Sequence, residues 1–259
     1  IKISPGHGIM NIDVQSFVRL AFRVFSEIGA GNLPVLDDLG KIMILKKVLG
    51  QKKDELKYFG RNINKDGYIS EIKSFMSELI QYGADEDEIE RMIKASEKKP
   101  VLKYKLQDMS VAFKSFKEYI EKNYITSEEL LSVFADVVSQ SELLKGAVIC
   151  LDGFTGFTPL QYRLLRELIK TAEMVYVTVT ADDRESVINK GKNYQLFFMS
   201  RKTVHNIRQI ASETGVEVLD DIWTGKEISQ TRFGESEELE WLERNLFRYP
   251  YKRYNKKNE

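Results

Sequence analysis

The loop that begins at residue 152 carries the residues best suited to chemistry. Asp152 follows the apolar run 147–151 (AVICL), whose pattern is typical of a β-strand buried on both faces. An aspartate at the carboxyl end of a parallel strand lies where nucleotide phosphates and Mg²⁺ bind in α/β folds. Such an aspartate can also do no more than cap its loop, and taken alone this feature favours the capping role.

The elements that must position this loop form an α/β unit. A second apolar run, 174–180 (MVYVTVT), predicts another buried strand, and the residues 160–171 between the two runs predict a helix. This order requires a parallel, right-handed crossover. Residues 216–219 predict a third strand after a helix at 201–214. Three strands are too few for a complete doubly wound sheet, so we expect the first strands of the fold in a segment before Ile1.

The part of the chain before this unit is mainly helical by pattern. Apolar residues at helical spacing over 13–28 predict a first helix, and further helices are expected between about 37 and 138. The sequence therefore predicts a helical block of about 110 residues set before an α/β core with few strands.

Composition excludes several classes of protein. The 39 Lys+Arg of the 259 residues balance 39 Asp+Glu, so nucleic-acid binding would need a local basic patch. No apolar run approaches the ~20 residues of a membrane-spanning helix, and we expect no membrane partner. Cys150 is the only cysteine, which excludes a disulfide framework and a cysteine-cluster metal site; we expect no metal site and a cytoplasmic location.

Residues 152–161 (DGFTGFTPLQ) resemble the Walker-B motif of UvrD-like superfamily-one helicases. Asp152 takes the position of the Mg²⁺-binding aspartate, whereas Gly153 replaces the catalytic glutamate, so we describe the motif as degenerate. Without that carboxylate, no residue of the motif orients and deprotonates the attacking water. We therefore predict no catalytic residue in this motif.

Two further segments resemble helicase motifs in the same order along the chain. Residues 14–25 look like the motif at a helix start that touches the DNA strand, and residues 180–187 resemble a Gly-Asp-x-x-Gln-Ser-Ile motif. In the second segment Asp182, Asp183 and Glu185 form a degenerate coupling motif, with Glu185 in the place of the coupling glutamine.

A phosphate-binding P-loop is absent from the sequence. No Gly-Lys pair precedes Ser or Thr, because the pairs at 40–41, 191–192 and 225–226 are followed by Ile, Asn and Glu. Together with Gly153, this absence predicts that the chain by itself has no ATPase activity.

Within this superfamily the chain is most similar to the AddB family, the helicase-like subunits of a bacterial ATP-dependent helicase/nuclease that processes double-strand breaks. The resemblance covers nearly the whole chain and rests on residues 16–29, 36–41, 56–60, 143–146, 152–159 and 238–243. It implies an α/β fold with an incomplete RecA-like (P-loop NTPase-type) parallel sheet and a large helical insertion subdomain. The implied organisation is a core start at 1–35, a helical insertion at 36–140, the remaining core at 141–247 and a tail at 248–259.

The resemblance also implies partners and cofactors. An AddA-type helicase/nuclease subunit and DNA would be the partners. Mg²⁺, ATP and a 4Fe-4S cluster would belong to the longer parent protein, the cluster in a cysteine-bearing nuclease domain that this chain lacks. We expect no cofactor in this chain.

The same resemblance implies two places of DNA contact. The candidates are Gln15, Ser16, Arg19 and Arg23 at the first helix, and Thr155 and Phe157 in the loop. The arginines can equally form a solvated helix face, and Phe157 can stack on a base or belong to the core. Two functions remain open: a catalytically silent, DNA-engaging module, and a purely structural protein-interaction module without DNA contact.

Overall fold

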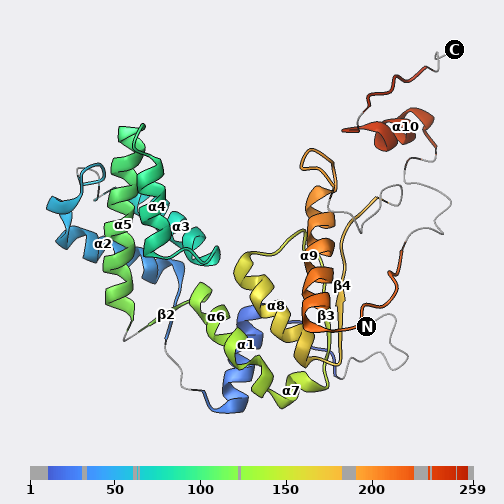
Figure 1. Ribbon diagram of the computed structural model, residues 1–259, viewed down its shortest axis with the longest axis horizontal. Coiled ribbons are helices and arrows are strands. Elements are labelled where there is room, and N and C mark those ends of the chain that lie inside the picture. Colours follow the sequence, from blue (N-terminus) through green and yellow to red (C-terminus); the bar gives the residue numbers. More distant parts are fainter. Residues whose placement is uncertain are drawn as a thin grey trace. The chain divides into compact units, whose positions relative to one another are not determined.

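The computed structural model describes residues 11–30, 34–60, 63, 65–121, 124–182, 191–224, 233, 235–248 and 250–255. The fold is α/β, with mostly helices and small parallel sheets (Figure 1). The chain divides into two compact units. Unit 1 contains residues 1–148 and 158–174, and unit 2 contains residues 149–157 and 175–259.

The elements follow one another in this order: α1 (Phe17–Ile28), β1 (Val35–Leu36), α2 (Asp38–Gln51), the 3-10 helix η1 (Lys53–Glu55), α3 (Asp66–Gln81), α4 (Glu86–Ala95), α5 (Pro100–Ile120), β2 (Ile125–Thr126), α6 (Ser127–Val137), η2 (Val138–Gln140), α7 (Glu142–Lys145), β3 (Val148–Leu151), α8 (Pro159–Thr171), β4 (Met174–Val177), α9 (Phe198–Thr214) and α10 (Glu237–Asn245).

The helices α2 to α5 share one hydrophobic core within unit 1 (Figure 1). Each presents an apolar face at helical spacing, and α2 and α4 begin at aspartate N-caps, Asp37 and Asp85. The side chains that are almost fully buried in this core include Leu45, Leu49, Ile69, Ile72, Ile89, Phe113, Phe116 and Ile120. Burial of each contributes about 1.5–3 kcal/mol, so the core accounts for the stability of the helical block.

A short parallel sheet lies where the chain enters and leaves these helices. Val35 of β1 pairs with Ile125 of β2, and Leu36 pairs with Thr126. Two-residue strands are too short to give an alternating pattern, and the sequence analysis did not predict them. The sheet brings the start of α2 close to the start of α6.

The rest of unit 1 is built from α1, α6 and α8. The ring of Phe25 in α1 meets the ring of Phe134 in α6 edge to face, with 6.3 Å between the ring centres. Helix α8 begins at a capping box, in which the Thr158 N–H donates to Gln161 Oε1 at 2.8 Å and the Gln161 N–H donates to Thr158 Oγ1 at 3.3 Å.

The predicted strand–helix–strand unit is confirmed as β3, α8 and β4. The Glu173 N–H donates to the Ala147 carbonyl and the Thr178 N–H donates to the Leu151 carbonyl, at 3.1 and 3.0 Å. Both pairs advance in the same chain direction, so the two strands are parallel. The second strand ends at Val177, earlier than the predicted residue 180.

Two expectations about this sheet are wrong. Residues 216–219 form no strand; they follow the C-cap of α9 and are exposed. The strands are not buried on both faces either, because the side chains of Val148 and Tyr176 are 61% and 44% exposed. Among the described residues the sheet has only two strands, so no third strand shields these side chains from water.

Candidate functional site

Asp152 lies directly after β3, as its place in the sequence predicts. Its carboxylate accepts a hydrogen bond from the Thr178 hydroxyl, and Thr178 directly follows β4. The aspartate therefore ties together the carboxyl ends of both strands while remaining exposed. In the described part of the chain, no three His, Cys, Asp or Glu residues form a group that could hold a metal ion.

Gly153, at the position of the catalytic glutamate in the resembling motif, has a left-handed backbone with φ +78°. Glycine adopts this conformation freely, whereas a residue with a Cβ loses about 1–2 kcal/mol there. A Cβ would meet nothing within 4 Å, so the constraint is the backbone and not space. The glycine therefore fits a sharp turn after Asp152.

The remainder of this loop rests on α9 within unit 2. The Thr155 carbonyl accepts a hydrogen bond from the Thr203 hydroxyl at 3.2 Å. The rings of Phe154 and Phe157 stack, with 4.9 Å between their centres and 26° between their planes. Phe157 is half-buried, so it combines the two roles that the sequence left open: part of its surface packs and part is accessible.

The candidates at the entry of α1 lie close together, but most already have partners. Ser16 is the N-cap, and its Oγ accepts from the Arg19 N–H at 3.3 Å. The Gln15 amide and the Arg23 guanidinium both donate to the Asp13 carboxylate. Asp13 was missed by the sequence analysis because it precedes the helix and has no helical spacing to Arg23. Arg19 remains an exposed cation at this entry.

Helix α1 is held in place at its other end by Glu27. The Glu27 carboxylate accepts hydrogen bonds from the Ser141 hydroxyl at 2.5 Å and the Leu143 N–H at 2.9 Å. These two bonds hold the pKa of Glu27 below its ordinary value, because they favour the charged form. The bonds connect α1 to the start of α7.

The third group of candidates is described only in part. Asp182 is buried, and its carboxylate forms an ion pair with Arg248. Asp183 and Glu185 lie outside the described residues. The pairing of Asp182 gives it a structural contact within unit 2 that its sequence position did not indicate, since Arg248 is 66 residues further along the chain.

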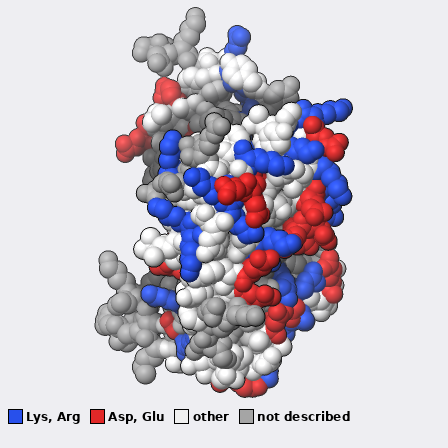
Figure 2. All heavy atoms as spheres, turned by 90° about the vertical axis from the view of Figure 1, so that its left-hand side faces the viewer, with Lys and Arg blue, Asp and Glu red and all other residues white. Residues whose placement is uncertain are grey.

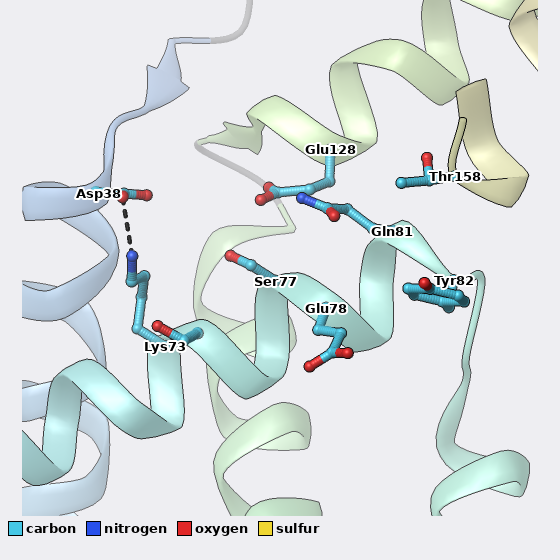
Figure 3. A pocket seen from close by; sticks show the side chains of 9 residues that line it. Asp38, Lys73, Ser77, Glu78, Gln81, Tyr82, Glu128 and Thr158 are labelled. Atoms are coloured by element: carbon cyan, nitrogen blue, oxygen red, sulfur yellow. Dashed lines mark hydrogen bonds and ion pairs between the residues drawn. The ribbon is translucent and has the colours of Figure 1, made fainter. Parts of the chain in front are cut away.

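A polar hollow of about 500 Å³ lies beside the β1–β2 sheet in unit 1, and sequence analysis did not identify it. Figure 3 shows Lys73 pointing at Asp38, with Glu128 across from them. Its lining residues are Asp38, Lys73, Ser74, Ser77, Glu78, Gln81, Tyr82, Glu128 and Thr158. They come from α2, α3, α6 and the N-cap of α8, and no single stretch of sequence shows such a set.

The charges of the hollow are largely neutralised by the chain itself. Lys73 Nζ donates to the Asp38 carboxylate at 2.8 Å, and this bond, with Lys41 nearby, lowers the pKa of Asp38. Lys41 Nζ contacts both oxygens of Glu128 at 3.0 and 2.9 Å. Paired carboxylates of this kind stay ionised and do not suit proton transfer. The arrangement is therefore that of a structural junction.

The family described as "ADDB, N-terminal" matches residues 1–243 of the chain. The chain belongs to this family. Three relatives are each named as the B component of an ATP-dependent helicase/deoxyribonuclease. The protein of Lachnoclostridium phytofermentans is 42% identical over 100% of this chain and 23% of its own length. Those of Clostridium novyi and Caldanaerobacter subterraneus subsp. tengcongensis are 33% and 34% identical over 97% and 96% of this chain, and over 22% and 21% of their own lengths.

This AddB-family chain thus spans less than a quarter of the length of these relatives. In the described residues, no helix is both long enough and apolar enough to cross a membrane. The family membership agrees with the motifs that carried the resemblance, above all the loop from Asp152 to Pro159. It attaches the described geometry to a subunit of a DNA-processing enzyme family.

Proposed function

We propose that this chain is a catalytically silent, DNA-engaging module in the helicase-like subunit of a double-strand-break-processing helicase/nuclease. The observation that carries the proposal is the 42% identity, over the whole chain, to a relative named as one component of an ATP-dependent helicase/deoxyribonuclease. Because that name describes one of several subunits, it supports a partner for this chain. We propose that the partner is of the AddA type and that both act in the cytoplasm.

The fold proposed for the module is a part of a RecA-like sheet interrupted by a helical insertion. The parallel pair β3–β4 with α8 between its strands supports this interpretation, as does Asp152 at the end of β3. The chain enters and leaves α2 to α5 through the paired strands β1 and β2, which suits an insertion at 36–140.

We propose no nucleotide chemistry for this chain. Mg²⁺ and ATP need a P-loop that the sequence lacks, and the Asp152 carboxylate is already bonded to Thr178 next to a glycine. A 4Fe-4S cluster needs several cysteines, and the chain has one. We therefore assign all three groups to the longer subunit of which the chain would be a part, or to its partner.

Silence of the degenerate motif gives a direct test. We expect Asp152→Ala in the complete subunit, assembled with its partner, to leave DNA-stimulated phosphate release unchanged, because Gly153 supplies no catalytic carboxylate. Asp220→Ala, which removes another exposed carboxylate of unit 2, is the matched control. A loss of tenfold or more in Asp152→Ala alone would contradict the proposal.

DNA contact at α1 gives the second test. Arg19→Ala should flatten the dependence of single-strand affinity on salt, lowering the slope of log K against log salt by about 0.7, the value of one phosphate contact. Arg23→Ala is the matched control, because Arg23 already pairs with Asp13 and should contribute less. Fluorescence anisotropy at several salt concentrations measures both slopes.

If Arg19→Ala and Phe157→Ala both fold and bind single strands as the wild type does, the DNA-contact assignment fails. The alternative, a purely structural module that docks on the partner subunit without touching DNA, would then replace it. Loss of subunit assembly in these variants would favour that alternative directly.

A further inference from the structure

The helical block of unit 1 has a strongly uneven distribution of charge. Residues 98–117 contain six lysines, one aspartate and no glutamate, although the whole chain is neutral. The aspartate, Asp108, is only 2% exposed and so projects no charge at the surface. Acidic residues gather on the neighbouring helix α4 instead, where Lys114 approaches Glu86 at 3.9 Å. Figure 2 faces this side of the chain and shows Lys and Arg side chains gathered beside a group of Asp and Glu.

A tight turn after η1 adds cations to this side of α5. The backbone N–H groups of Lys57, Tyr58 and Phe59 all donate to the Asp108 carboxylate, at 2.8, 2.7 and 2.8 Å. At Gly60 a Cβ would lie 2.8 Å from the Leu56 carbonyl oxygen, so only glycine allows this close approach. The turn is thus fixed onto α5, with the side chains of its first two residues at the surface.

Two lysines and two tyrosines alternate across the contact between this turn and α5. Lys57 Nζ lies 5.7 Å from the ring centre of Tyr104, and Lys105 Nζ lies 4.8 Å from the ring centre of Tyr58. Lys57 Nζ also donates to the side-chain oxygen of Gln107 at 3.2 Å. Neither lysine forms an ion pair with a carboxylate of the described residues. We call Lys57, Tyr58, Tyr104 and Lys105 the Lys/Tyr surface.

The chemistry of this surface favours phosphate over bases. Each tyrosine ring already has an ammonium group over one face, and cation–π contacts of this kind hold the charge in place. The rings therefore position charge instead of offering a clear stacking platform. Lysines held in this way lose little further entropy when they meet an anion, and no carboxylate of the described residues competes with that anion.

We propose that the Lys/Tyr surface binds the phosphate backbone of duplex DNA, independently of sequence. The proposal rests on the proposed function for the choice of DNA as the polyanion, but it uses none of the motif residues of that function. It gives the helical insertion its own contact with nucleic acid. The fixed turn and α5 would lie against a duplex, whose charge density exceeds that of a single strand.

The test compares duplex binding by the complete subunit, assembled with its partner, as wild type and as the Lys57→Ala/Lys105→Ala double variant. With a short labelled duplex and a salt titration, we expect roughly tenfold weaker binding and a slope lowered by about 1.8, or two phosphate contacts. Lys57→Arg/Lys105→Arg keeps both charges and should bind nearly as the wild type does. Lys145→Ala/Lys170→Ala is the matched control, because these lysines pair with Glu142 and Glu167.

The outcomes separate this proposal from the proposed function. If Lys57→Ala/Lys105→Ala assembles and melts normally yet binds duplex with unchanged affinity and slope, the proposal is wrong even where Arg19→Ala weakens single-strand binding. If the double variant no longer assembles with its partner and still keeps duplex affinity, the surface binds an acidic protein and the proposal is also wrong. If Tyr58→Phe/Tyr104→Phe keeps duplex affinity while Tyr58→Ala/Tyr104→Ala loses it, the role of the rings in placing the lysines is supported.

Discussion

Glu128→Ala is expected to lower the free energy of unfolding of unit 1 by about 3–5 kcal/mol, the usual cost of leaving one partner of a buried ion pair alone. The side chains of Lys41 and Glu128 are 5% and 9% exposed, and Lys41 Nζ contacts both carboxylate oxygens. Without Glu128, the Lys41 ammonium would stay buried with only Asp38 nearby, at 3.7 Å. Denaturant unfolding followed by far-UV circular dichroism measures the loss.

Two controls isolate the buried charge. Lys41→Met/Glu128→Leu removes both charges at similar volume, and it should recover most of the stability, since apolar replacements of buried pairs are often neutral. Lys73→Ala breaks the neighbouring pair with Asp38, whose side chain is 69% exposed, and should cost no more than about 1 kcal/mol. If Glu128→Ala costs as little as Lys73→Ala, the buried pair does not hold this junction.

The elements whose pattern is local could be predicted from the sequence. The apolar runs at 147–151 and 174–180 predicted β3, β4 and their parallel pairing, and Ser16 and Gly29 bound α1 as N-cap and left-handed C-cap. Prediction failed where a partner is distant. The strands β1 and β2 are 89 residues apart, and two residues show no periodicity. The pair Lys41–Glu128 joins positions that look like ordinary polar helix sites.

The candidate site divides in the same way. The strand end at Asp152 was predictable, because the composition of the preceding run marks the strand. The left-handed backbone of Gly153 and the bond from Thr178 were not, since they depend on how the loop closes over the second strand. Likewise, Asp13 limits what Arg23 can bind, a contact that no helical spacing reveals. Residue types therefore located the site, and tertiary contacts decided which side chains remain available.

Asp108→Ala is expected to destabilise unit 1 by roughly 3–5 kcal/mol and also to weaken duplex binding, although it removes no positive charge. The carboxylate accepts three backbone N–H donors from the turn, and hydrogen bonds to a charged group contribute about 1.5–3 kcal/mol each before partial compensation by water. Without it, the turn would loosen and Lys57 would lose its fixed place beside Tyr104. Denaturant unfolding and the duplex salt titration measure the two effects.

Asp108→Asn separates the two consequences of this change. An amide keeps one oxygen as an acceptor but points N–H groups at the donors on its other side, so its stability should fall between that of wild type and Asp108→Ala. Asp87→Ala, in the exposed first turn of α4, controls for the loss of a negative charge and should leave both measurements close to wild type. Duplex affinity should follow stability in the order wild type, Asp108→Asn, Asp108→Ala, because both depend on the same turn. If Asp108→Ala loses stability but keeps the full salt slope, the lysines bind phosphate without help from the turn, and the fixed geometry of the Lys/Tyr surface is not what DNA recognises.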